Sequence, residues 1–165
     1  SYIYCMTRYR LSTQIEDQCN AFFQGLSEMI DPRWLRLFNR EELRVLVSGA
    51  ESPIDVDDLR RNTVYGGYHE KDMAVQYFWE ALSHFDQSSL KVFLRFVTSS
   101  PNPPLLGFSE LNPKFAIRHA GDDVTRLPTA STCVNLLKLP AYESVAQCAD
   151  KLRYAIYAGA GFDLS

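Results

Sequence analysis

The spacing of the apolar residues changes at a proline-rich break, Pro101–Gly107, and this change constrains the fold more than any other feature. Ahead of the break, apolar residues follow the three-four repeat of an amphipathic helix over 74–85 and 90–97. Behind it, residues 115–119 alternate in polarity, and 134–139 form an apolar run too short for a helix. We therefore expect an α+β fold in which a small sheet packs against helices.

The first 48 residues are predicted to be helical and to end at a break in composition. Apolar residues from Tyr2 to Leu26 recur at helical spacing, which predicts one long amphipathic helix followed by two short ones. Gly49–Ser52 joins small residues to Pro53, so a boundary or hinge is expected there. Tyr65–Tyr68 is predicted to be an aromatic-flanked turn, and a last helix is expected from Ser144.

Charge and composition limit the classes of partner and the cellular locations that we expect for this chain. The net charge of -3 offers no basic stripe for phosphates, which disfavours nucleic acid and favours protein partners. Apolar stretches stop well short of the roughly 20 residues that a membrane span needs, and no signal segment opens the chain. A cytoplasmic or nuclear location without membrane contact is expected. The scattered cysteines indicate neither a metal site nor a disulfide scaffold, so one of them is a candidate working thiol.

Cys133 is the candidate nucleophile. It ends a stretch of small polar residues after Pro128, which delivers it to the start of a strand. These neighbours leave room for a bulky acyl group, and their hydroxyls and backbone N–H groups suit a thiolate or an oxyanion. The alternative is a packing role, because free cysteine is often buried. Packing is also the default interpretation of Cys5, Cys19 and Cys148.

His119 suggests an alternative reaction for Cys133. Paired with Cys133 and oriented by Asp122 or Asp123, it would form a protease-like dyad. No segment of the sequence matches a cysteine-protease nucleophile signature, however. We therefore interpret His119 as an ordinary residue at the end of a strand.

Several separate strings resemble the HECT ubiquitin-ligase domain in their order and spacing, and together they span the whole chain. The strings are Leu127–Pro128 through Thr132–Cys133–Val134–Asn135, Gly66–Gly67–Tyr68, Phe78–Trp79–Glu80, Phe96–Val97–Thr98 and Gly161–Phe162. Leu136–Pro140 and the ending Ala160–Ser165 look most like the proteasome-associated, chain-elongating branch of that family. An association with the proteasome is therefore expected from the resemblance.

The resemblance implies a division of the chain and a reaction. Residues 1–48 would be the closing helices of the N-terminal lobe, 49–52 the interlobe hinge and 53–165 the C-terminal catalytic lobe. Cys133 would accept ubiquitin from a ubiquitin-conjugating enzyme as a thioester and pass it to a lysine of a protein substrate or of ubiquitin, without a cofactor. Most of the lobe that docks the conjugating enzyme in this family is absent, so this chain alone is expected to be poorly charged.

The resemblance also assigns supporting residues. Thr132 and Asn135 would shape the loop or contact the ubiquitin tail, and Phe162 matches a phenylalanine required for ligation. Many members carry histidine two residues before the cysteine, where this chain has Ser131, so another group must deprotonate the attacking lysine, whose reference pKa is roughly 10.4. A ubiquitin-binding module without turnover and a cysteine hydrolase remain the alternatives.

Overall fold

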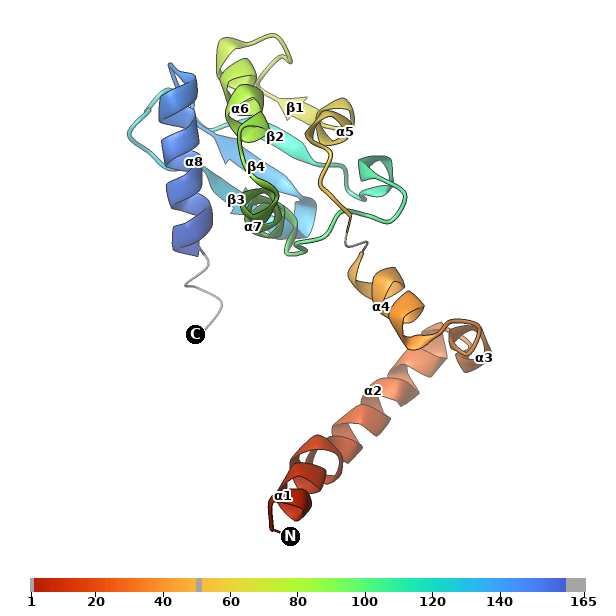
Figure 1. Cartoon of the computed structure of the whole chain (residues 1–165). Coiled ribbons are helices and arrows are strands. Elements are labelled where there is room, and N and C mark those ends of the chain that lie inside the picture. Colours follow the sequence, from red (N-terminus) through yellow and green to blue (C-terminus); the bar gives the residue numbers. More distant parts are fainter. Residues whose placement is uncertain (1, 50–51, 160–165) are drawn as a thin grey trace. The chain divides into compact units, whose positions relative to one another are not determined.

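The computed structural model describes residues 2–49 and 52–159 (Figure 1). The chain divides into two compact units, Ser1–Leu43 and Arg44–Ser165. The first holds α1 (Tyr2–Leu11), a 3-10 turn (Thr13–Ile15), α2 (Glu16–Met29) and α3 (Pro32–Leu35), and α4 (Arg40–Ser48) crosses the division. The second holds α5 (Val56–Arg61), β1 (Val64–Gly66), α6 (Met73–Ser83), α7 (Gln87–Thr98), a 3-10 turn η2 (Phe108–Glu110), β2 (Ala116–His119), β3 (Thr129–Ser131), a 3-10 turn η3 (Thr132–Val134), β4 (Leu136–Leu139) and α8 (Val145–Gly159).

The first unit corrects two expectations. The single helix predicted from Tyr2 to Leu26 is wrong, because the chain leaves helical geometry at Ser12 (φ -131°, ψ -68°) and starts α2 afresh. A serine there offers the backbone local alternatives to helix, which the apolar spacing does not report. No described residue of α1, α2 or α3 is buried, so Cys5 and Cys19 are exposed and do not pack in a core as expected.

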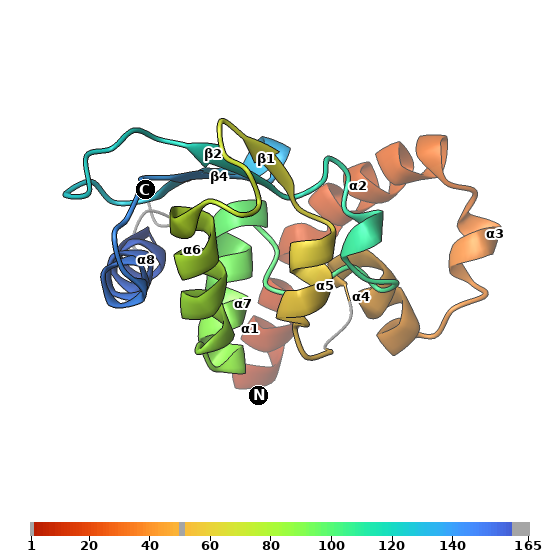
Figure 2. The same ribbon diagram turned by 90° about the horizontal axis from the view of Figure 1, so that it is seen from above.

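The second unit is built on a four-stranded sheet in the order β1-β2-β4-β3. The first three strands in this order pair in parallel, and β3 pairs antiparallel with β4. Ile117 and Leu137 are opposite each other and buried, whereas the next pair, Arg118 and Lys138, points to the other face. Figure 2 shows α6, α7 and α8 gathered on one side of this sheet.

The strands differ from the expected ones in extent and number. Ala116–His119 confirms the first predicted strand, but the second begins at Leu136 because the chain first makes a 3-10 turn through Val134. Two three-residue strands were not predicted. Val64–Gly66 overlaps the predicted turn Tyr65–Tyr68 at Tyr65 and Gly66, and Thr129–Ser131 carries no alternating pattern long enough to recognise.

The core lies between the sheet and the helices, as the α+β prediction requires. The apolar faces of α6 and α7 meet there, and Phe93 links them to the sheet, with ring centroids 6.0 Å from Phe78 and 6.1 Å from Phe115. Asp86 begins α7 by accepting a hydrogen bond from the backbone N–H of Ser89 at 3.0 Å. Within the described ranges, no helix combines the length and the apolar character that a membrane crossing requires.

Candidate functional site

Cys133 lies at the tip of a tight reversal between two paired strands. Ser131 ends β3 opposite Leu136, which starts β4, so only the turn Thr132–Asn135 connects them. The middle of such a connection cannot enter the sheet, and the Cys133 side chain is exposed. This short reversal places the Cys133 thiol at the end of the β3–β4 pair.

Asn135 closes this turn and anchors it. Its backbone is left-handed (φ 49°, ψ 44°), and its N–H donates to the carbonyl of Thr132 at 3.3 Å. Its carbonyl accepts from the N–H of Ala116 at 3.0 Å, and its side-chain Nδ2 donates to the carbonyl of Pro113 at 2.6 Å. The residue is only 7% exposed. Asn135 therefore joins the Cys133 turn to β2 and to the segment ahead of β2.

Thr132 contributes to the turn through its backbone and leaves its side chain at the surface. Its carbonyl is the acceptor that closes the turn, and the residue itself is exposed beside Cys133. Phe162, the other residue expected to support the reaction, lies outside the described residues. Among the expected residues, the structure thus brings Thr132, Cys133 and Asn135 together.

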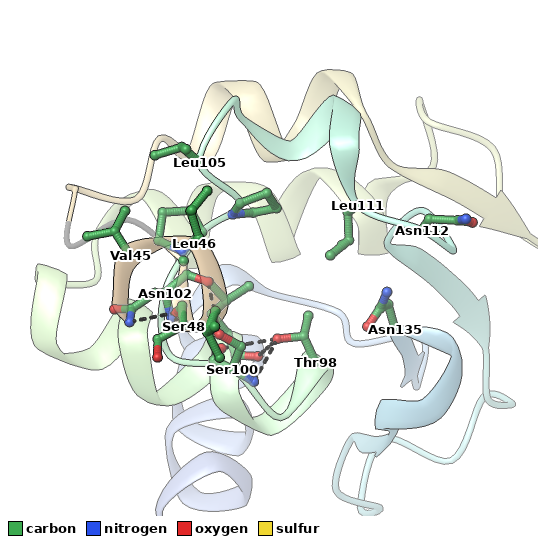
Figure 3. Close-up of a pocket in the computed structure, with 15 residues that line it drawn as sticks. Val45, Leu46, Ser48, Thr98, Ser100, Asn102, Leu105, Leu111, Asn112 and Asn135 are labelled. Atoms are coloured by element: carbon green, nitrogen blue, oxygen red, sulfur yellow. Dashed lines mark hydrogen bonds between the residues drawn. The ribbon is translucent and has the colours of Figure 1, made fainter. Parts of the chain in front are cut away.

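The rear of the turn rests near α7 and borders a cavity. Helix α7 packs against both η3 and β3. A cavity of about 410 Å³ lies between the end of α7, the end of α4 and Asn135 (Figure 3). The loop after α7, with Asn102, forms another part of its lining. Sequence reasoning missed Asn102 and Pro113, since their contacts join segments far apart in the chain and leave no local pattern.

His119 lies too far along the sheet to serve Cys133 as a base. The register sets Ala116 level with Leu136 and His119 level with Leu139, whereas Cys133 precedes Leu136. Three residues of strand separate the level of Ala116 from His119, which is about 10 Å at the usual rise per residue. His119 instead lies 3.1 Å from the carboxylate of Asp122 through Nε2. The protease-like dyad is therefore contradicted, and His119 is a strand-end residue.

The cysteines of the second unit have opposite environments. Cys148 lies on α8 and is fully buried, which confirms its packing role, and burial raises the pKa of its thiol to about 12. Such a thiol is neither accessible nor ionised near neutral pH. Cys133 is exposed on its turn. It is therefore the thiol of this unit that can react with a large acyl donor.

Comparison of the sequence with known proteins identifies one family. The family model described as HECT-domain (ubiquitin-transferase) matches residues 1–165. The chain is 48% identical over 165 residues to a probable E3 ubiquitin protein ligase of Schizosaccharomyces pombe and 51% identical over 164 residues to the E3 ubiquitin-protein ligase HUL5 of Saccharomyces cerevisiae, each over 99% of its length. It is 41% identical over 191 residues to the human ubiquitin-protein ligase E3B, over 100% of its length. It spans only 16%, 18% and 18% of these relatives.

Proposed function

The chain belongs to the HECT-domain family of ubiquitin transferases, and from this premise we propose that Cys133 carries ubiquitin as a thioester. The ubiquitin would come from a ubiquitin-conjugating enzyme and pass to a lysine of a protein substrate or of another ubiquitin. The observation that carries the proposal is the exposed thiol of Cys133 on a turn that Asn135 anchors at its rear.

The chemistry consists of two acyl transfers. In the first, the Cys133 thiolate attacks the thioester carbonyl of the charged conjugating enzyme, and the thiolate of that enzyme leaves. In the second, a neutral lysine amine attacks the Cys133 thioester, gives up a proton and expels the Cys133 thiolate as the isopeptide bond forms. Each step exchanges one bond to the acyl carbon for another, so neither needs a cofactor. The exposure of Cys133 suits both attacks, because each partner is a protein.

We further propose that the chain acts as the end of a HECT domain within a longer polypeptide, called the intact ligase below. Residues 1–48 would close the N-terminal lobe, 49–52 would be the hinge and 53–165 the catalytic lobe. Exposed apolar side chains on the helices of the first unit, such as Phe22 and Trp34, suit a segment that packs against further protein. Ala50 and Glu51 of the proposed hinge lie outside the described residues.

The partners of the intact ligase follow from the same proposal. They would be ubiquitin, a ubiquitin-conjugating enzyme and protein substrates in the cytoplasm or the nucleus. Resemblance to the chain-elongating branch supports the proteasome as an additional partner. Phe162 would act after charging, in the transfer to lysine.

A single charging assay tests the main proposal. The intact ligase is incubated with ubiquitin, activating enzyme and conjugating enzyme, and adducts are separated with and without a reducing agent. We expect a reducible ubiquitin adduct that is lost in Cys133→Ala and retained in Cys19→Ala, the control for another exposed cysteine.

Other outcomes would contradict the proposal. An adduct mapped to a different cysteine would remove Cys133 from the carrier role. Hydrolysis of ubiquitin conjugates without an adduct would favour the hydrolase alternative. Ubiquitin binding that Cys133→Ala leaves unchanged, without any adduct, would favour a binding module.

A further inference from the structure

The loop that follows α7 holds the end of α4 within the second unit. The side-chain Nδ2 of Asn102 donates to the backbone carbonyl of Ser48, the last residue of α4, at 3.0 Å. The last carbonyls of a helix have no partner within the helix, so a side-chain donor from elsewhere in the chain satisfies one of them. Figure 3 shows Asn102 and Ser48 facing each other across this bond.

Gly49 brings the backbone against the same loop. Its φ of +80° is a left-handed conformation that glycine adopts without strain. A Cβ at this position would lie 2.7 Å from the carbonyl oxygen of Pro103 and 3.1 Å from the Cβ of Asn102. Any other residue at 49 would therefore force the end of α4 away from the loop.

Asn102 is held in place by its own loop. Ser99 ends α7 in a left-handed conformation (φ 67°), which turns the chain back toward α4. The hydroxyl of Ser100 donates to the carbonyl of Asn102 at 3.1 Å and accepts from its N–H at 3.3 Å. These two bonds fix the backbone of Asn102, which carries the side-chain amide that donates to Ser48.

The contact between Asn102 and Ser48 borders the same cavity as the Cys133 turn, and it is exposed to water. The cavity behind it has Val45 and Leu46 of α4 on one side and Asn135 on another (Figure 3). Its lining carries no charged residue within the described ranges. The hydrogen bond between Asn102 and Ser48 is exposed and borders this cavity, so water can satisfy both groups when the two separate.

We propose that Asn102 is a positioning residue for ubiquitin transfer, which with Gly49 forms a releasable latch between the end of α4 and the unit that carries Cys133. The inference rests on the proposed function. While the latch is closed, Ser48 and Gly49 move with this unit, and when it opens they move separately. Charging and transfer present Cys133 to different partners, so they depend on the latch to different extents.

The test uses three variants of the intact ligase and one control. Asn102→Ala removes the donor, Asn102→Asp keeps the shape but replaces the donor by an acceptor, and Gly49→Ala adds the Cβ that meets Pro103. Asn112→Ala is the matched control, because Asn112 is an amide on the opposite side of the same cavity (Figure 3). Hydrogen exchange is measured at Val47 and Ser48, and single-turnover rates are measured separately for charging and transfer.

We expect faster exchange at the end of α4 in all three variants and a ratio of charging to transfer that changes by about threefold or more. Asn112→Ala should match the parent in both measurements. Unchanged exchange would overturn the latch, and so would faster exchange with an unchanged ratio of rates. Hydrogen exchange does not depend on ubiquitin transfer, so it tests the latch even if Cys133 does not carry ubiquitin. The absence of a thioester on Cys133 would contradict the proposed function instead.

Discussion

Replacing Asn135 separates the two ways in which this residue supports the Cys133 turn. Its left-handed backbone is one, and its side-chain hydrogen bond to the carbonyl of Pro113 at 2.6 Å is the other. Asn135→Gly keeps the backbone conformation at no steric cost but loses the hydrogen bond. Asn135→Ala loses the bond and also replaces asparagine, which adopts the left-handed region readily through its short polar side chain, by alanine, which does not.

The expected losses in the free energy of unfolding follow from these two terms. Losing the hydrogen bond to the exposed Pro113 carbonyl costs roughly 0.5–1.5 kcal/mol, and this term is common to both variants. The left-handed conformation adds up to roughly 1–2 kcal/mol in Asn135→Ala, because alanine lacks the polar side chain that eases this conformation in asparagine. Glycine has a smaller cost, since it loses more chain entropy on folding by roughly 0.5–1 kcal/mol. Asn135→Ala should therefore be the less stable of the two, by about 1 kcal/mol.

Urea unfolding of the 165-residue chain, followed by tryptophan fluorescence, measures both losses because Trp79 is buried in the second unit. Domains of this kind are stable by roughly 5–15 kcal/mol, so both variants should remain folded at low urea. Equal losses in the two variants would refute the role of the left-handed backbone. No loss in either would refute the anchoring of the Cys133 turn to Pro113.

Three further predictions test the thiols, a helix cap and the chain end. Iodoacetamide at about pH 8 should label Cys133 in the folded chain but leave Cys148 unlabelled until denaturation, since burial raises the pKa of that thiol to about 12; mass spectrometry of digested protein checks this. Hydrogen bonds from Ser88 and Ser89 lower the pKa of Asp86 from 3.8 to about 2, so the charged cap stabilises the fold above about pH 4 and this contribution disappears as the pH falls toward 2. The melting temperature of Asp86→Asn should accordingly lie below that of the parent at pH 6 and converge with it near pH 2, and a gap that is constant with pH would contradict the argument. In the intact ligase, Phe162→Ala should leave the thioester on Cys133 able to form and suppress isopeptide transfer in a gel assay, whereas equal loss of both steps with early melting would indicate a packing role.

The sequence alone predicted the features that depend on local spacing. The three-four repeat predicted α6 and α7, and the change of pattern after the proline-rich break predicted a sheet and thus an α+β fold. The small residues before Cys133 predicted a thiol presented ahead of a strand, where η3 lies. These predictions succeed because a helix face or a strand end is set by residues that are close neighbours in the chain.

Tertiary structure alone decided what depends on pairing between distant segments. Three-residue strands such as Val64–Gly66 are too short to show a period, so only their partners define them. The register separates His119 from Cys133, although both had been assigned to strand ends. The sequence predicted the same packing role for Cys5, Cys19 and Cys148, and only the folded structure separates the buried Cys148 from the exposed Cys5 and Cys19.

The hydrogen bonds that anchor the Cys133 turn and the end of α4 also depend on segments that are distant in the sequence. Asn135 reaches Pro113 and Asn102 reaches Ser48 across long stretches of chain. A single amide side chain has the same local signature whether it faces water or a distant carbonyl, so its sequence neighbours carry no information about its partner. The sequence could therefore indicate the candidate cysteine and the family, whereas the contacts that hold the Cys133 turn in position are visible only in the folded chain.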